Sequence, residues 1–215
     1  DVAVVERHTH KSNFTTLRNK QLTESQQVIR DLASVAAGFS KDAISRQRRR
    51  QLDSYDFDQL KETGFLLAGV PADQAGLWTG PARSARAYSQ MVRTTAHGDP
   101  SVALVASLHP AATGFFLGVE SVDDEAVAWR VQRQCVVESA REHWWGTVTS
   151  EPGSGGDILK TRSIATPEKD HFLITGDKHV GSGSGQADFM ITTTKVKGSE
   201  LPELFFLQNK DEPWD

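Results

Sequence analysis

Two glycine-rich stretches contain most of the residues in this sequence that could do chemistry. The first, TVTSEPGSGGD, covers residues 147–157 and leaves a run of β-strand character. Its glycines expose successive backbone N–H groups that can cradle an anion. The hydroxyls of Thr149 and Ser150 have the right chemistry to bind the carbonyl and imide edge of a heteroaromatic ring. Spacing alone leaves a second interpretation open, because a hairpin-like turn uses the same residue types.

The second stretch, KHVGSGSGQADF, covers residues 178–189 and lies between two segments of strand character. It has small residues where a sheet normally has large ones. Glycines in such a place indicate that another group comes close to the backbone. The sequence therefore predicts a close approach at this stretch, without identifying the group.

The elements that must position these stretches are helical first and β-rich afterwards. Before residue 142 the apolar residues recur at helical spacing, as in the stripe Val28, Leu32, Val35 and Phe39. Asp99 and Pro100 predict the N-cap and first turn of a helix that ends at His109. Beyond residue 142 the pattern changes to short β-rich segments, at residues 144–149, 163–165, 172–175, 189–196 and 204–208.

This order of elements favours an α+β protein and not alternating βαβ units. We expect an all-α N-terminal domain at residues 22–141 and a mainly antiparallel β domain at residues 142–215. Residues 1–21 are polar and are expected to form a mobile N-terminal segment. His8 and His10 of that segment lack a third ligand, so no metal site is predicted.

Composition narrows the class of protein. The 215 residues have a net charge of −4, and the one dense basic run is residues 46–50. Within it, Arg48, Arg49 and Arg50 are interpreted as a solvent-exposed helix face. No nucleic-acid footprint is predicted. No apolar run approaches the roughly 18 residues of a membrane helix, and the N-terminus lacks the apolar segment of a signal peptide. The single cysteine, Cys135, is compatible with a reducing compartment. We therefore expect a cytoplasmic protein without membrane or nucleic-acid partners.

Three separated motifs, in order, resemble the acyl-CoA dehydrogenase superfamily. TSEPGSGGD at residues 149–157 is similar to that family's T-E-P-x-x-G-S-D, and TRSIAT follows it. HFLITGDKHVGSGSGQADFMITTT at residues 171–194 is similar to the G-x-K-x-x-I-T/S turn and the following Ala-Asp strand. Upstream, LDSYDFDQLKETGFLLAGVPAD and GDPSVALVASLH resemble its helical segments. The resemblance covers roughly residues 22–214.

The resemblance implies an FAD site at the first stretch. It places Thr147, Thr149 and Ser150 at the flavin ring and Gly156 near the phosphates and the substrate thioester. The family has a serine where this chain has Gly156. Any phosphate or thioester contact must then come from the backbone N–H of Gly156 or from Ser154.

In the second stretch the resemblance aligns Val180, Gly181 and Ser182 with the ring-facing W-I-T of the dehydrogenases. Ser182 can donate a hydrogen bond to flavin N5. Val180 in place of tryptophan leaves space for O2 or a larger substrate, as in the K-x-x-x-S-G pattern of the superfamily's monooxygenases. His109 is a candidate acid or base if the protein is a monooxygenase. The alternative is a hydrogen-bonded histidine at a helix end.

Three functions stay open. The first is FAD-dependent α,β-dehydrogenation of an acyl thioester, with acyl-CoA or another small molecule as substrate and electron-transfer flavoprotein as partner. The second is a two-component monooxygenase that takes reduced FMN or FAD as co-substrate from a flavin reductase. The third is a non-catalytic fragment or binding module. The family assembles as dimers or tetramers, and its second helical bundle, with the catalytic glutamate, lies beyond the β domain, so we expect this chain to be incomplete.

Overall fold

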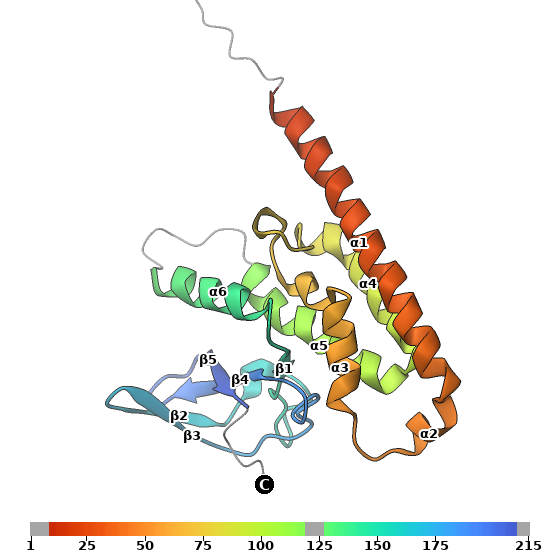
Figure 1. Cartoon of the computed structure of the whole chain (residues 1–215). Helices are drawn as coiled ribbons and strands as arrows, with labels where there is room; N and C mark the ends of the chain where they lie inside the picture. The colour runs from red at the N-terminus through yellow and green to blue at the C-terminus, as the bar shows by residue number, and fades with distance from the viewer. Residues whose placement is uncertain (1–8, 119–126, 210–215) are drawn as a thin grey trace, which may run out of the picture.

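The computed structural model describes residues 9–118 and 127–209, with side chains from Glu24 onward. Helices gather in one half of the molecule and the strands in the other, with α5 between the other helices and β1 (Figure 1). The α-helices are α1 (Thr9–Lys41), α2 (Ala43–Arg48), α3 (Ser54–Glu62), α4 (Pro81–Gly98), α5 (Pro100–Leu117) and α6 (Val127–Ser139). Three short 3-10 helices lie between them or in the sheet half: η1 (Phe65–Gly69), η2 (Ala72–Gln74) and η3 (Ile158–Lys160).

Helix α1 packs its predicted apolar stripe against α4. Val28, Leu32 and Phe39 are buried in the helical core, and Val35 packs against it. The helix begins at Thr9, so Thr23 and Ser25, which are residue types that commonly cap helices, lie inside it. Of the two histidines considered as metal ligands, His8 lies outside the described residues.

Helix α5 begins as its sequence predicts. The carboxylate of Asp99 accepts hydrogen bonds from the backbone N–H groups of Ser101 and Val102, and Pro100 occupies the first turn. The predicted end at His109 is wrong, because the helix continues through Pro110 to Leu117. The hydroxyl of Thr113 donates to the carbonyl of His109 at 3.0 Å and so binds a backbone oxygen beside the proline.

By length and composition α5 is also apolar enough to cross a membrane, with a mean hydropathy of 1.3 over its 18 residues. Half of that segment is buried inside the molecule. A core helix of a soluble protein passes the same test, so α5 gives only weak evidence for a membrane span.

The five strands form one mixed sheet: β1 (Trp145–Thr147), β2 (Ile164–Glu168), β3 (His171–Thr175), β4 (Phe189–Val196) and β5 (Pro202–Gln208). One edge of β4 pairs in parallel with β1 at its start and with β2 at its end. Its other edge pairs antiparallel with β5, and β2 forms a hairpin with β3.

The prediction of a mainly antiparallel β domain is therefore wrong. The sheet is mixed, with parallel and antiparallel pairings both meeting at β4. Alternation of apolar and polar residues shows that a segment is a strand, but it does not show the direction of the neighbouring strand. The two hairpin-like connections are local, whereas both parallel pairings join segments far apart in the chain.

Adjacent tryptophans join the two halves. Trp144 packs in the helical core, with its ring centroid 5.4 Å from that of Phe57 and 5.6 Å from that of Phe65. Trp145 stacks on Phe189 of β4 at 5.1 Å. Consecutive strand side chains point to opposite faces, so this pair anchors the start of β1 in both halves at once.

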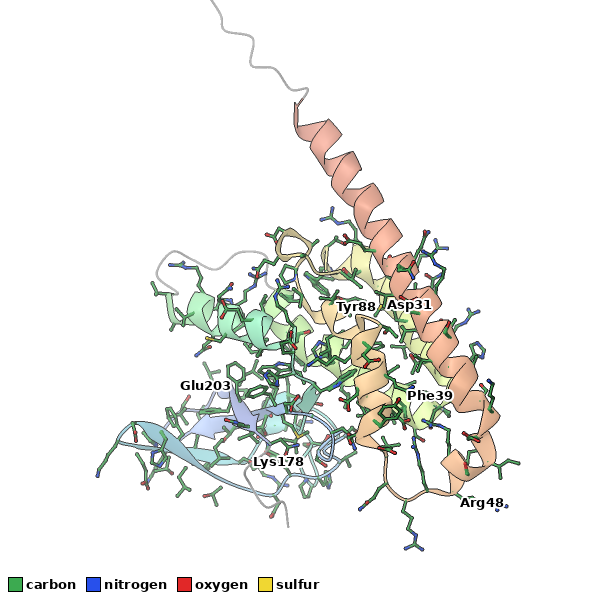
Figure 2. All side chains as sticks on the ribbon, in the orientation of Figure 1. Asp31, Phe39, Arg48, Tyr88, Lys178 and Glu203 are labelled. Atoms are coloured by element: carbon green, nitrogen blue, oxygen red, sulfur yellow. The ribbon has the colours of Figure 1, made fainter. Side chains whose placement is uncertain are left out.

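The basic run predicted to be a solvent-exposed helix face is exposed only in part. Arg46 contacts the carboxylates of Asp56 and Asp99 at 2.7 and 2.9 Å, and Arg49 contacts the same two at 2.6 and 3.0 Å. Both carboxylates are buried. Arg48 is exposed and lies at the end of α2 (Figure 2). The prediction thus holds for Arg48 and is wrong for Arg49, which pairs, as Arg46 does, with the N-cap of α5.

Candidate functional site

The first glycine-rich stretch continues directly from β1. Thr147 pairs with Ile191 of β4, and the backbone N–H of Val148 donates to the carbonyl of Ile191 at 2.9 Å. The hydroxyl of Thr192 donates to the carbonyl of Val148 at 2.8 Å. Val148 is buried between the half-buried Thr147 and Thr149. The strand end therefore holds the two threonines at a fixed place beside β4.

The loop that follows is shaped by three glycines with left-handed backbones, at φ values of 77°, 64° and 83° for Gly153, Gly155 and Gly156. The hydroxyl of Ser154 closes this turn, because it donates to the carbonyl of Glu151 at 3.0 Å and accepts the N–H of Gly156 at 3.3 Å. The predicted substrate contacts of Ser154 and Gly156 stay predictions. Both groups are already used inside the turn.

The second stretch lies directly against the first. The backbone N–H of His179 donates to the carbonyl of Ser150 at 3.0 Å. A Cβ at Gly181 would be 3.3 Å from the side chain of Val148. The structure thus brings together the two stretches that the sequence singled out. They are distant in the chain: Lys178 of the second stretch comes 27 positions after Glu151 of the first.

The small residues of this region are explained in part by the chain itself. A Cβ at Gly183, where φ is 87°, would be 3.1 Å from the side chain of Val105 on α5. A Cβ at Gly146 would be 3.1 Å from that of Ala187 and 3.3 Å from the carbonyl oxygen of Ser182. The close approach that the sequence predicts is therefore made by β1 and α5, whatever else binds there.

The residues suited to a flavin are four with free hydroxyls, three at the end of β1 and one in the loop before β4. Among the described residues, no hydrogen bond engages the side chains of Thr147, Thr149, Ser150 and Ser182, and all four are half-buried. The hydroxyls of Ser154, Thr161 and Ser163 nearby are all engaged. Free hydroxyls held by a rigid turn are the groups with which a protein binds the polar edge of a ring. This arrangement fits a flavin.

A buried ion pair, which we did not predict, connects the two stretches. Glu151 follows Ser150, and its Oε1 lies 2.6 Å from Nζ of Lys178. Burial opposes the charged form of Glu151, but hydrogen bonds from Lys178, Ser163, Thr161 and the N–H of Arg162 outweigh it and hold the pKa of Glu151 well below its usual value. The sequence signal that could have predicted this ion pair was the presence of a glutamate in one motif and a lysine in the other.

His109 is fully buried in α5 and has two partners. Its Nδ1 accepts the backbone N–H of Trp145 at 3.3 Å, so Nε2 carries the proton and donates to the carbonyl of Leu66 at 3.0 Å. Burial lowers the pKa of His109 to about 4, although the bond to Leu66 opposes this change. The predicted acid or base role of His109 stays a prediction. Its ring joins η1, α5 and β1.

Val180 has a strained backbone on the outside of the second stretch. Its φ of 59° is left-handed, which is rare for a β-branched residue, and its side chain is 75% exposed. We expect Val180→Gly to raise the free energy of unfolding by about 1 kcal/mol, measured by urea denaturation. Val180→Ala keeps a Cβ in the left-handed conformation and should gain less. A loss of stability in Val180→Gly would show that this turn is not strained.

The candidate site consists of half-buried residues at the end of β1 and in the loop before β4. A hollow of about 720 Å³ lies elsewhere, beside the end of α1 and α2, and is lined by residues 40–45, Arg48 and Arg49. None of the residues that the motifs suggest for a cofactor lines it. We therefore base the candidate site on the two stretches and their free hydroxyls, not on the size of a cavity.

No family model matches the sequence, and no curated protein was found to match it. Solved structures do match. FMN-bound TdsC from Paenibacillus sp. A11-2 is 19% identical, with a TM-score of 0.65 over 85% of this chain and 44% of that chain. Methanesulfinate monooxygenase MsuC from Pseudomonas fluorescens is 20% identical, with a TM-score of 0.62 over 85% and 43%. The FAD complex of PigA is 17% identical, with a TM-score of 0.64 over 89% and 48%.

These matched structures belong to the acyl-CoA dehydrogenase superfamily, and the chain spans less than half of the length of each. Identities of this size show the fold and no more. The resemblance found in the sequence motifs is confirmed at that level. This chain shares the fold of these matched structures, over a little less than half of their length.

Proposed function

We propose that this chain provides the flavin-contacting surface of a flavin-dependent oxidoreductase of acyl-CoA dehydrogenase type. One observation carries the proposal: four half-buried hydroxyls without partners among the described residues lie at the end of β1 and in the adjoining loop before β4. The names of two matched structures, FMN-bound TdsC and the FAD complex of PigA, support flavin as the ligand class.

Each residue of the surface has a proposed task. Thr147, Thr149 and Ser150 bind the carbonyl and imide edge of the ring, and Ser182 donates a hydrogen bond beside its N5. Gly156 lies toward the phosphates. A bound FAD would supply a hydride acceptor at N5, suited to α,β-dehydrogenation of an acyl thioester. In this proposal the substrate is acyl-CoA or a similar small molecule, electron-transfer flavoprotein is the redox partner, the enzyme is a homo-oligomer and the compartment is the cytoplasm.

A specific feature favours a second candidate, a two-component monooxygenase. Val180 is small and 75% exposed, so it leaves the proposed ring position open to O2 or a large substrate. The matched MsuC structure is named as a monooxygenase. In this case reduced FMN or FAD would be a co-substrate supplied by a flavin reductase. A non-catalytic binding module is the third possibility.

Titration of the chain with FAD and FMN, oxidised and reduced, tests the proposal. Each hydrogen bond contributes about 1 kcal/mol to binding, so we expect Thr149→Val and Ser182→Ala each to raise the flavin dissociation constant roughly fivefold. Flavin fluorescence measures this change. Ser89→Ala is the matched control, since that hydroxyl lies on the exposed side of α4 and donates only to the carbonyl of Ala85.

The outcomes separate the three functions. Binding of oxidised FAD that is bleached anaerobically by an acyl-CoA supports dehydrogenation. Tighter binding of reduced than of oxidised flavin supports the monooxygenase. If the folded chain binds neither FAD nor FMN in either redox state, the flavin proposal fails and the binding module remains.

A further inference from the structure

Glu151 and Lys178 form an ion pair that is almost entirely shielded from water. The side chain of Glu151 is 3% exposed and that of Lys178 13%, and the two charged atoms lie 2.6 Å apart. Figure 2 shows Lys178 in the sheet half of the molecule. Neither side chain is one of the groups proposed to contact a flavin.

Both members of the pair are held by further partners from other elements. Glu151 accepts the hydroxyl of Ser163 at 2.6 Å and the backbone N–H of Arg162 at 2.6 Å, together with the hydroxyl of Thr161. Lys178 donates to the carbonyl of Thr193 on β4 and to the hydroxyl of Thr161. The pair is therefore fixed to β4 and to the segment before β2, and cannot shift as a free surface pair does.

Each charged residue is close in sequence to proposed flavin contacts. Glu151 directly follows Ser150, and Lys178 precedes His179, whose N–H donates to the carbonyl of Ser150 at 3.0 Å. Ser182 comes four residues after Lys178. The ion pair and this backbone bond together hold the first stretch to the second.

We propose that the Glu151–Lys178 ion pair is a positioning device that sets the relative placement of the Ser150 and Ser182 hydroxyls and thereby the affinity for flavin. The inference rests on the proposed function. Stability by itself does not account for the pair, because a buried ion pair commonly contributes no more than a well-packed apolar pair of the same volume. Fixed geometry is what such a pair adds, and here it fixes the two stretches that have the free hydroxyls.

Amide hydrogen exchange, measured by NMR on the whole chain without flavin, tests the positioning directly. In Glu151→Gln and Lys178→Met we expect the His179 amide to exchange at least about tenfold faster, because its bond to Ser150 opens locally. The Val148 amide, bonded to Ile191 on β4, should keep its rate. Lys160→Met is the matched control: Lys160 pairs with Asp157 at 3.5 Å in the same region but is exposed.

Flavin titration of the same variants gives the second measurement. We expect each single variant to raise the flavin dissociation constant about tenfold. The double variant Glu151→Gln with Lys178→Met should raise it by less than the product of the two single factors. Lys178→Arg keeps the charge and should stay within about threefold of the original chain. If Glu151→Gln does not fold, the comparison of Lys178→Met with Lys178→Arg decides alone.

The results also separate this inference from the proposed function. Unchanged exchange at His179 in Lys178→Met overturns the positioning role, whatever happens to flavin. A Lys178→Arg variant as impaired as Lys178→Met also overturns it, because charge would then be irrelevant. Faster exchange at His179 in a chain that binds no flavin supports the holding of the two stretches and rejects the flavin function.

Discussion

Replacing His109 by leucine is expected to lower the free energy of unfolding by about 3 kcal/mol at pH 7. The leucine leaves the carbonyl of Leu66 and the N–H of Trp145 buried without their partner, and each such group costs roughly 1 to 3 kcal/mol. Both bonds are made by the His109 ring, which is fully buried. Urea denaturation at pH 7 measures the loss.

The same residue makes stability depend on pH in a window set by its two pKa values. Burial holds the pKa of His109 at about 4 in the folded chain, below its ordinary value of 6.5, which applies in the unfolded chain. The unfolded chain therefore binds more protons between these values, and stability is lost as the pH falls from about 6.5 toward 4. From pH 7 to pH 5 we expect a loss of about 2 kcal/mol that His109→Leu does not show.

This comparison isolates His109 from the other titrating groups. The remaining histidines are common to both proteins, and Glu151, whose pKa is also lowered, changes charge only below its usual range. Equal pH slopes in the two proteins would mean that His109 is not buried in its neutral form. His109→Gln, which keeps one hydrogen-bonding group, should lose less stability than His109→Leu. A loss of activity in His109→Gln that exceeds its loss of stability would support the predicted acid or base role of His109.

Sequence alone predicted the features that depend on neighbouring residues. The Asp99 carboxylate caps α5 as expected because its partners are the N–H groups of Ser101 and Val102, two and three residues away. The segment 189–196 was predicted at its observed bounds as β4. Its β-branched and aromatic residues lie between turn residues, and this local signal is strong for a strand.

What sequence did not predict depends on distant contacts. The two parallel pairings of β4 require β1 and β2 to reach it from far along the chain. The continuation of α5 beyond His109 requires a tertiary setting that tolerates Pro110, which propensity alone disfavours. His109 consequently lies within a helix and on its buried side, not at the helix end where a hydrogen-bonded cap was the alternative.

The candidate site shows the same division. Motif spacing identified both glycine-rich stretches, and the bond between His179 and Ser150 confirms that they lie together. The reason for the small residues was predicted incompletely, since Val105 and Val148 of the chain itself crowd Gly183 and Gly181. Those contacts come from α5 and from the segment after β1, so they could not be read from the spacing of the glycines.

The crossing of α1 and α4 yields the other large effect. Gly98 is buried at the end of α4, and a Cβ there would lie 2.5 Å from the carbonyl oxygen of Ala36 and 2.6 Å from its Cα. These are backbone atoms of α1, so no side-chain rotation relieves the overlap. We expect Gly98→Ala to lower the free energy of unfolding by about 3 kcal/mol, because the two helices must separate. Urea denaturation followed by far-UV circular dichroism measures this loss.

Gly38 provides the matched control for the same substitution in the same pair of helices. It lies on the exposed side of α1, and nothing comes within 4 Å of a Cβ placed there. Alanine favours the helix over glycine, so Gly38→Ala should raise the free energy of unfolding by about 0.5 kcal/mol. Helix propensity favours alanine at both positions. The opposite signs of the change in the free energy of unfolding therefore come from the contact at Gly98 alone. If Gly98→Ala were also stabilising, the backbones of α1 and α4 could not be as close at Ala36 as the structure has them.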